Sequence, residues 1–302
     1  MKPLLPQFHL HLHLHLRLRL LPPNPEEVFA FVALVSSIFL FVLPIASAQL
    51  APSDFFALQA VHRSLRDVVG PPITSSPSSS SSSVSSDSAS FWPSPTSFFA
   101  SWDFARDPCS FDGVLCDMVG GHERVVALNL GIASGGSAGL RGHLPPEIGH
   151  LTALVQLTLA PGKVSGPIPT SIGYLKSLQN LGLGHNLLVG PIPVELGQLT
   201  GLQTLDLGYN RLSGGVPQEL AAITSLVTLR LAHNRLTGQL PISFRSMSQL
   251  DHVDMRRNSL EGPLPLLPQS VTYLDLSRNR LTGPLTEAIS PLTSLTYIDL
   301  SE

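Results

Sequence analysis

The chain has 302 residues, of which 43% are apolar and only 13% are charged, and its formal net charge is −3. An average soluble domain has about 25% charged residues, and a chain this apolar is not expected to be disordered. The small negative charge gives no general attraction to nucleic acid or to anionic lipid. We therefore expect no nucleic-acid partner.

The first 48 residues have the pattern of a secretory leader. Basic residues precede the uncharged apolar run Val28–Leu43, and Ala46-Ser47-Ala48 has the small-x-small form of a cleavage site. We expect residues 1–48 to be a signal peptide; because Glu26 and Glu27 directly precede the apolar run, an uncleaved signal anchor is the alternative. No later apolar run reaches the roughly 18 residues of a membrane span. Membrane attachment is therefore expected only through an uncleaved leader or through a missing C-terminal segment.

Residues 51–117 are expected to form a cap that precedes a set of repeats, with a Ser-rich insertion at 71–95. Apolar residues recur at helical spacing from Phe55 to Val69, after Ser53 as the N-cap, which predicts a short amphipathic helix. The insertion has too few apolar residues to order itself and predicts a flexible loop. It is either a tolerated insertion or an O-glycosylated stalk.

Cys109 and Cys116 are the two cysteines of the chain. In a chain with a secretory leader we expect them to form one disulfide that pins the cap over the first repeat. His122 alone does not complete a tetrahedral ligand set with them. We therefore expect no metal ion and no cofactor.

After residue 125 an apolar residue returns at near-constant intervals, with spacings of 29, 24, 24, 24, 24, 21 and 24 residues. These positions are Leu128, Leu157, Leu181, Leu205, Leu229, Val253, Leu274 and Ile298. The unit from Leu175 to Pro193 matches the leucine-rich repeat template. Residues 125–302 are therefore expected to hold seven complete repeats and one partial repeat.

Each position in the repeat has a physical role. Leu181 and Leu183 point to the same side of a strand, so units stacked about 4.8 Å apart form one parallel sheet with a leucine core behind it. An Asn recurs where the chain leaves the strand, and its amide can satisfy turn backbone inside the coil. This ladder consists of Asn186, Asn210, Asn234, Asn258 and Asn279. The expected fold class is α/β, a leucine-rich repeat solenoid with a curved parallel β-sheet and a disulfide-pinned N-terminal cap.

Residues Gly135 to Gly139 match the Gly-x-Ser-x-Gly motif of hydrolases. That motif acts only between a strand and an amphipathic helix, with an acid and a His later in the chain. Leu140 to Pro145 instead continue an ordinary repeat. We therefore expect no catalytic residues and no enzyme activity.

Several motifs resemble the plant-specific class of leucine-rich repeats. Gly190-Pro191-Ile192-Pro193 is one of them, and Gly166-Pro167-Ile168-Pro169 is another. Ser101-Trp102, followed by Asp107-Pro108-Cys109 and by residues 113–116, resembles the N-terminal domain that precedes such repeats. The resemblance covers about residues 51–302 and implies the extracellular domain of a plant receptor-like protein or receptor-like kinase.

The chain departs from this family in two respects. Phe111 stands where the family usually has Trp, and no Asn-x-Ser/Thr sequon occurs in the chain. Family ectodomains are usually glycosylated at such sites, so N-glycosylation is expected to be absent here.

Side chains that alternate with the core leucines are expected to face the concave surface of the sheet. The column that precedes the ladder Asn consists of Pro161, His185, Tyr209, His233, Arg257 and Arg278. Arg230, His252 and Arg256 lie in neighbouring columns. Our hypothesis is that this basic, aromatic-edged face binds an acidic group or a free carboxylate, which Arg can clamp with two hydrogen bonds. The alternative is that these positions are solvated and that Asp206, Asp254, Asp275 and Asp299 neutralise them.

The resemblance implies a recognition module that binds a peptide, protein or glycan on its concave face, for signalling or defence. A co-receptor kinase is a further candidate partner. The implied location is secreted or at the plasma membrane, on the extracellular side. The alternative function is a secreted inhibitor of a microbial cell-wall-degrading enzyme.

The sequence ends inside its eighth unit, after Leu300 and before the expected Asn. A solenoid needs a terminal cap over its last apolar face, and a truncated gene product would explain its absence. The edge strand near Tyr297 is then open, which predicts self-association.

Overall fold

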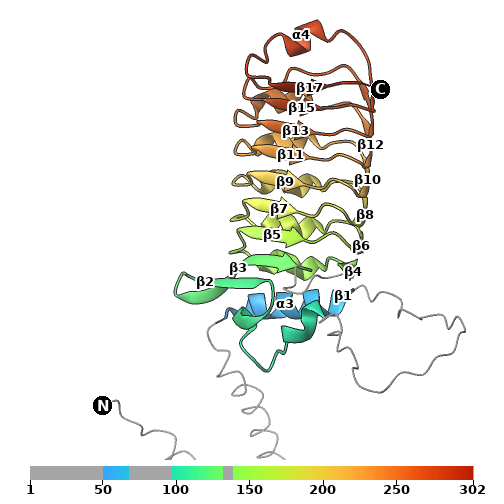
Figure 1. Cartoon of the computed structure of the whole chain (residues 1–302). Coiled ribbons are helices and arrows are strands. Elements are labelled where there is room, and N and C mark those ends of the chain that lie inside the picture. Colours follow the sequence, from blue (N-terminus) through green and yellow to red (C-terminus); the bar gives the residue numbers. More distant parts are fainter. Residues whose placement is uncertain (1–49, 68–96, 132–138, 302) are drawn as a thin grey trace, which may run out of the picture. The chain divides into compact units, whose positions relative to one another are not determined.

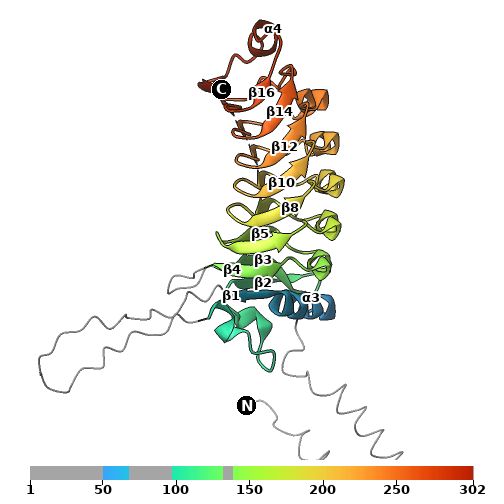
Figure 2. The ribbon, with the colours of Figure 1, turned by 90° about the vertical axis from the view of Figure 1, so that its right-hand side faces the viewer.

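The computed structural model describes residues 50–67, 97–131 and 139–301, all of which belong to the compact unit Gln49–Glu302. This unit is a stack of coils with a sheet on each of two sides (Figures 1 and 2). The expected leader, the Ser-rich insertion and residues 135–138 of the hydrolase-like motif lie outside the described residues. Within the described part of the chain, no helix has the length and apolar character needed to cross a membrane.

The predicted parallel sheet is present and has nine strands. All neighbours are parallel except the first two, which form an antiparallel hairpin at the cap. In sheet order the strands are β2 (Val114–Val119), β3 (His122–Leu130), β5 (Gln156–Leu159), β7 (Asn180–Gly182), β9 (Thr204–Asp206), β11 (Thr228–Arg230), β13 (His252–Asp254), β15 (Tyr273–Asp275) and β17 (Tyr297–Asp299). From β3 onward, the repeating apolar residue of each strand is buried in one shared core, as predicted, except for Ile298 in the last strand.

A second sheet, which the sequence analysis did not predict, lies on another side of the coil (Figure 2). In sheet order its strands are β1 (Leu65–Asp67), β4 (Leu140–His143), β6 (Lys163–Gly166), β8 (Leu187–Gly190), β10 (Arg211–Gly214), β12 (Arg235–Gly238), β14 (Ser259–Gly262) and β16 (Arg280–Leu281). From β6 onward, each strand of this sheet begins at the residue directly after the repeat position that the ladder Asn occupies. A single buried residue such as Leu212 then alternates with more exposed neighbours, which is too short a pattern for sequence periodicity to identify.

Short 3-10 helices form a third side of the coil. They are η3 (Pro146–His150), η4 (Thr170–Tyr174), η5 (Val194–Gln198), η6 (Gln218–Ala222) and η7 (Ile242–Ser246). Each follows a Pro in extended conformation, such as Pro193 before η5, and buries its third residue against the core, as Leu196 does. In the seventh repeat the short α-helix α4 (Thr286–Ile289) takes this place.

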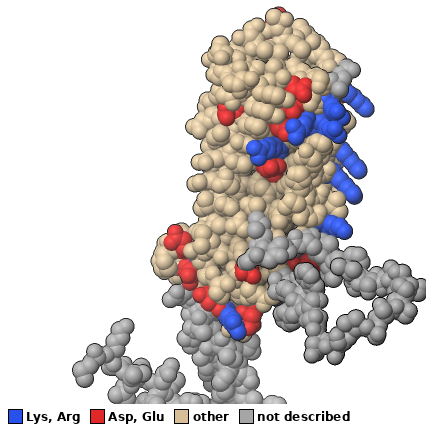
Figure 3. All heavy atoms as spheres, viewed as in Figure 1, with Lys and Arg blue, Asp and Glu red and all other residues tan. Residues whose placement is uncertain are grey.

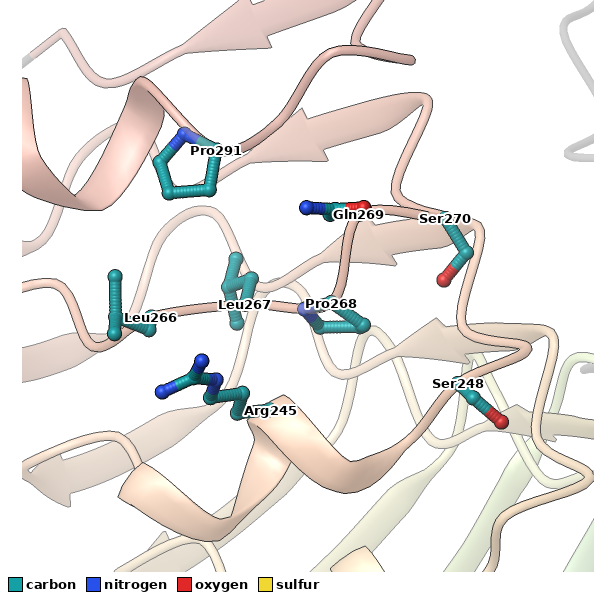
Figure 4. A pocket seen from close by; sticks show the side chains of 8 residues that line it. All are labelled: Arg245, Ser248, Leu266, Leu267, Pro268, Gln269, Ser270 and Pro291. Atoms are coloured by element: carbon teal, nitrogen blue, oxygen red, sulfur yellow. The ribbon is translucent and has the colours of Figure 1, made fainter.

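The sixth repeat has no such helix, because it is three residues shorter than its neighbours. Val253 and Leu274 are 21 residues apart instead of 24, and β14 runs into β15 without an intervening helix. The shorter connection leaves an open hollow of about 410 Å³ between η7 and the segment that follows α4 (Figure 4). Its lining residues are Arg245, Ser248, Leu266, Leu267, Pro268, Gln269, Ser270 and Pro291.

The cap contributes α3 (Pro52–Ser64), η1 (Phe98–Ser101) and η2 (Pro108–Ser110). The predicted disulfide between Cys109 and Cys116 is confirmed; their Cα atoms are 5.6 Å apart, and the bond joins η2 to β2. Phe111, which stands where the family usually has Trp, is buried and stacks on Trp102 with ring centroids 5.4 Å apart. An aromatic ring therefore fills this position of the cap.

The helix predicted from Phe55 to Val69 is wrong at both ends. It begins earlier, at Pro52, because Pro suits the first turn of a helix, and Ser53 lies inside the helix instead of capping it. It ends at Ser64 because Leu65–Asp67 pairs antiparallel with β4. Strand pairing with the second sheet thus overrides the helical spacing of the apolar residues.

Candidate ligand-binding face

The outward side of the nine-stranded sheet, which we call the nine-strand face, is the candidate site. The strand register places equivalent positions of successive repeats side by side, so that Thr204, Thr228, His252 and Tyr273 are neighbours in turn. Equivalent positions, in the strands and in the turns that follow them, therefore form columns across the repeats. Two of these columns are aromatic stacks, and a charged cluster lies beside them.

The first stack consists of His185, Tyr209 and His233, in the turns that follow β7, β9 and β11. The ring centroids are 4.1 Å apart in the first pair and 4.0 Å apart in the second, and the planes differ by no more than 13°. Arg257 and Arg278 occupy the same turn position in the next two repeats. The column thus presents three flat rings followed by two guanidinium groups.

All five residues of this column have a left-handed backbone, with φ between 53° and 57°. This conformation costs a residue other than glycine about 1–2 kcal/mol. In the fourth repeat Asp206 precedes such a turn and accepts a hydrogen bond from the Gly208 N–H at 3.0 Å. Glycine would relieve the strain, so large side chains at five such positions suggest a role outside folding.

The second stack consists of His252, Tyr273 and Tyr297, at the first position of β13, β15 and β17. Their ring centroids are 4.2 Å and 4.4 Å apart. Burial lowers the pKa of His252, and nearby Arg230 lowers it further; burial also raises the pKa of Tyr273. Neither tyrosine was among the site residues predicted from the sequence, although alignment of the repeats places both in the same column as His252.

Arg256 is engaged in contacts within the protein. Its Nη1 atom lies 3.2 Å from Asp275 Oδ2 and 3.7 Å from Asp254 Oδ2, and its Nη2 donates a hydrogen bond to the Tyr209 hydroxyl at 3.5 Å. Burial of the Asp254 side chain raises the pKa of that carboxyl. Arg230 lies 3.9 Å from an Asp206 oxygen and is half exposed. A ligand carboxylate would have to compete with these internal partners.

Arg257 and Arg278 are more available. Both side chains are exposed, and neither forms an ion pair with another residue in the described ranges. Partial burial lowers the pKa of neighbouring His233, and the charges of Arg257 and Arg256 lower it further. The unpaired positive charge of the face is therefore concentrated at one end of the first column.

The ladder asparagines lie next in sequence to the first column and hold its turns in place. Asn210 Oδ1 accepts from the Leu188 N–H at 3.0 Å, and its Nδ2 donates to the carbonyl oxygens of Leu183 and Leu207 at 3.0 Å and 3.1 Å. Equivalent bonds form at Asn186, Asn234, Asn258 and Asn279. Each Asn ties its turn to the preceding repeat and so fixes the spacing of the column residues.

Among the described residues, the one close group of metal-ligating types is Cys109, Cys116 and Glu123. Both sulfur atoms are held in the disulfide, and a metal ion binds the free thiolate. The group therefore contains metal-ligating residue types, but its two sulfur atoms are not available as thiolate ligands.

Comparison with known families identifies the repeats and the cap separately. The profile described as "Leucine rich repeat" matches residues 176–236, a second profile of the same description matches residues 270–292, and "Leucine rich repeat N-terminal domain" matches residues 87–117. The chain therefore contains leucine-rich repeats, and the segment before them matches the N-terminal domain of such repeats. No curated protein sequence matches it.

Solved structures with this fold include plant receptor ectodomains. A plant peptide hormone receptor, RGFR1 in complex with RGF2, is 33% identical over 58% of this chain and 32% of its own, with a TM-score of 0.50. The ectodomain of the Arabidopsis receptor kinase HAESA with an extended IDA peptide hormone is 26% identical over 82% of this chain and 41% of its own, with a TM-score of 0.53. The chain thus spans about a third of the first of these solved chains and about two fifths of the second.

A plant ice-binding protein is also similar. It is 23% identical over 84% of this chain and 87% of its own, with a TM-score of 0.50. Identity at this level shows a common fold, and one fold can carry different functions. The function therefore has to be argued from the residues on the faces of the solenoid.

Proposed function

We propose that this chain is the extracellular recognition module of a plant receptor-like protein and that it binds a peptide along the nine-strand face. The observation that carries the proposal is the first column, which consists of three stacked rings and two arginines without ion-pair partners among the described residues. These five residues, in consecutive repeats, all have a strained left-handed backbone. The similarity to RGFR1 and to HAESA, both in complex with peptide hormones, supports a peptide over a protein or glycan ligand.

The peptide is proposed to lie across the strands along this column. Five repeats with strands about 4.8 Å apart give a path of roughly 19 Å, which an extended peptide of about six residues would cover. Tyr209 and its two His neighbours would contact apolar or aromatic side chains of the peptide. Arg257 and Arg278 would bind an acidic side chain or the terminal carboxylate, a role for which Arg256 and Arg230 are less suited because Asp residues already engage them.

Signalling would follow from a second partner. The HAESA complex with its hormone also contains the co-receptor SERK1, and we propose a co-receptor kinase as the partner that joins this chain once the peptide is bound. The expected signal peptide and the disulfide both fit an extracellular location.

The test begins with a display library of short peptides with free C-termini, selected against the secreted full chain. Selected peptides are then measured on Tyr209→Ala and on the double variant Arg257→Gln/Arg278→Gln. We expect Tyr209→Ala to weaken binding at least tenfold. Amidation of the peptide C-terminus should weaken binding of the parent chain and have little further effect in the double variant.

Matched controls come from the helical side of the coil. Tyr174 is exposed in η4 and Arg245 is exposed in η7, so Tyr174→Ala and Arg245→Gln remove the same chemical groups elsewhere. Equal losses in the control and face variants, or no selected peptide at all, would reject peptide recognition by this face. Tight inhibition of a secreted microbial wall-degrading enzyme, with no peptide selected, would favour the inhibitor alternative.

A further inference from the structure

Cations recur on the outward side of the eight-stranded sheet, which we call the eight-strand face. In β10, for example, Leu212 is buried while Arg211 is exposed. Six of the eight strands carry an exposed Lys or Arg, namely Arg66, Arg141, Lys163, Arg211, Arg235 and Arg280. Figure 3 shows Lys and Arg side chains projecting in a row from the side on which Figure 1 places β6 to β12.

Backbone carbonyls engage one member of this row, since Arg66 Nη1 donates hydrogen bonds to the His62 and Leu65 oxygens, but carboxylates of the described residues engage none of it. None of the six side chains forms an ion pair with another residue in the described parts of the chain. The strands of this sheet contain two carboxylates: Asp67 accepts hydrogen bonds from the Ser97 hydroxyl and the Phe98 N–H, and Glu261 lies opposite Arg280. A strongly basic face thus exists on a chain whose net charge is −3.

The cations also lie close to one another. Arg141 is the direct neighbour of Arg66 on one side and of Lys163 on the other. Like charges directly opposite one another on a sheet destabilise it, so folding gains nothing from this arrangement. A bound anion that bridges the strands would remove the repulsion.

We propose that the eight-strand face binds a linear acidic polysaccharide, a polyuronate, laid along the stack of coils. The seven strand intervals between β1 and β16 extend roughly 34 Å, which suits a long polymer better than a small anion. A polyuronate carries one carboxylate on each sugar ring, and these carboxylates can pair with the Arg or Lys of the six strands that carry one.

Hydroxyl side chains on this face also suit a sugar polymer. Ser165, Ser213, Thr237 and Ser259 lie in the same strands as the cations or between them, and their hydroxyls can bond to ring hydroxyls. No described strand of this sheet contains Phe, Tyr or Trp, so the face has no ring on which a nucleic-acid base could stack. The disulfide also indicates an oxidising compartment outside the cytosol.

The proposal is tested by binding of the secreted full chain to immobilised polygalacturonate at several salt concentrations. The double variant Arg211→Gln/Arg235→Gln removes two cations from the middle of the face. Because each ion contact releases about one counterion, we expect this variant to bind at least tenfold more weakly in low salt. The slope of log affinity against log salt should fall by about two.

Two controls decide the outcome. The double variant Lys176→Gln/Arg245→Gln loses the same charge from exposed positions outside this sheet and should bind as the parent does, while methyl-esterified polygalacturonate should not bind. Unchanged binding of Arg211→Gln/Arg235→Gln, or an equal loss in the control variant, would overturn the proposal. So would equally tight binding to a DNA duplex, which would show ion exchange without preference for the sugar. Because the peptide test changes residues in the turns that precede this sheet and none in its strands, either proposal can fail while the other stands.

Discussion

At the scale of single residues, the repeat places one side chain per coil in a strained turn. Because His185, Tyr209 and His233 are stacked, replacing one of them with Gly would remove both the backbone strain and a stacking contact. The two effects on stability could not be separated there. Arg278 has φ of 57°, is exposed, and has neither a stacking partner nor an ion pair among the described residues. It is therefore the position at which the cost of the left-handed backbone can be measured alone.

We predict that Arg278→Gly stabilises the protein by about 1 kcal/mol, because glycine adopts this backbone without strain. Arg278→Ala should give no such gain, since alanine keeps the Cβ atom that causes the strain. Urea unfolding of the two variants and the parent measures the difference. If both variants have the same stability, the left-handed backbone of this column is not strained by the Cβ atom.

At the scale of elements, the cap is joined to the first repeat by a contact that the sequence analysis did not identify. Asp54 in α3 is fully buried, and its carboxylate accepts hydrogen bonds from Arg124 Nε at 2.9 Å, from Arg124 Nη2 at 3.0 Å and from the Val125 N–H at 2.9 Å. The two residues are 70 positions apart and interrupt no periodic pattern, so no local signal connects them.

We predict that Asp54→Ala destabilises the protein by about 3 kcal/mol, because removing one partner of a buried ion pair leaves the other without compensation. Asp103→Ala is the matched control, since Asp103 pairs with Arg106 at 3.5 Å while both side chains are largely exposed. That change should cost less than about 1 kcal/mol. Chemical denaturation compares the two, and similar losses would show that α3 is held mainly by its apolar face.

Elements also show where sequence reasoning succeeds. Leu181, Leu205 and Leu229 are buried side by side because a constant interval is enough to place them in one core. The end of α3 and the second sheet were not predicted, since both depend on backbone pairing between segments that carry no long pattern of their own. In the candidate site, alignment of the repeats found the first column and named Asp275 among the carboxylates that could neutralise the arginines. It did not indicate that Arg256 is the partner of Asp275, which depends on side-chain conformation.

At the scale of the whole molecule, stability depends on contacts between neighbouring repeats. Both sheets continue through the sixth repeat, but the row of short helices is interrupted there by the hollow beside Leu266 and Pro291. The strands β15 and β17 are therefore coupled to the earlier repeats through two layers instead of three. A weaker connection at one interface lets the repeats beyond it open without unfolding of the rest.

This interruption can be repaired with the protein's own sequence. Replacing Leu266–Pro268 with a copy of the six residues Ile242–Met247 restores the 24-residue interval and supplies the Phe that is buried in η7. Burial of that side chain stabilises by about 2 kcal/mol, so hydrogen exchange of the β15 amides should become roughly 30-fold slower. The same graft with Ser in place of Phe has equal length but lacks the buried aromatic side chain. Its β15 amides should exchange at the same rate as those of the parent. If both grafts slow exchange equally, the length of the connection alone sets how strongly β15 is coupled to the earlier repeats. The missing helix would then not be the reason for the weaker coupling.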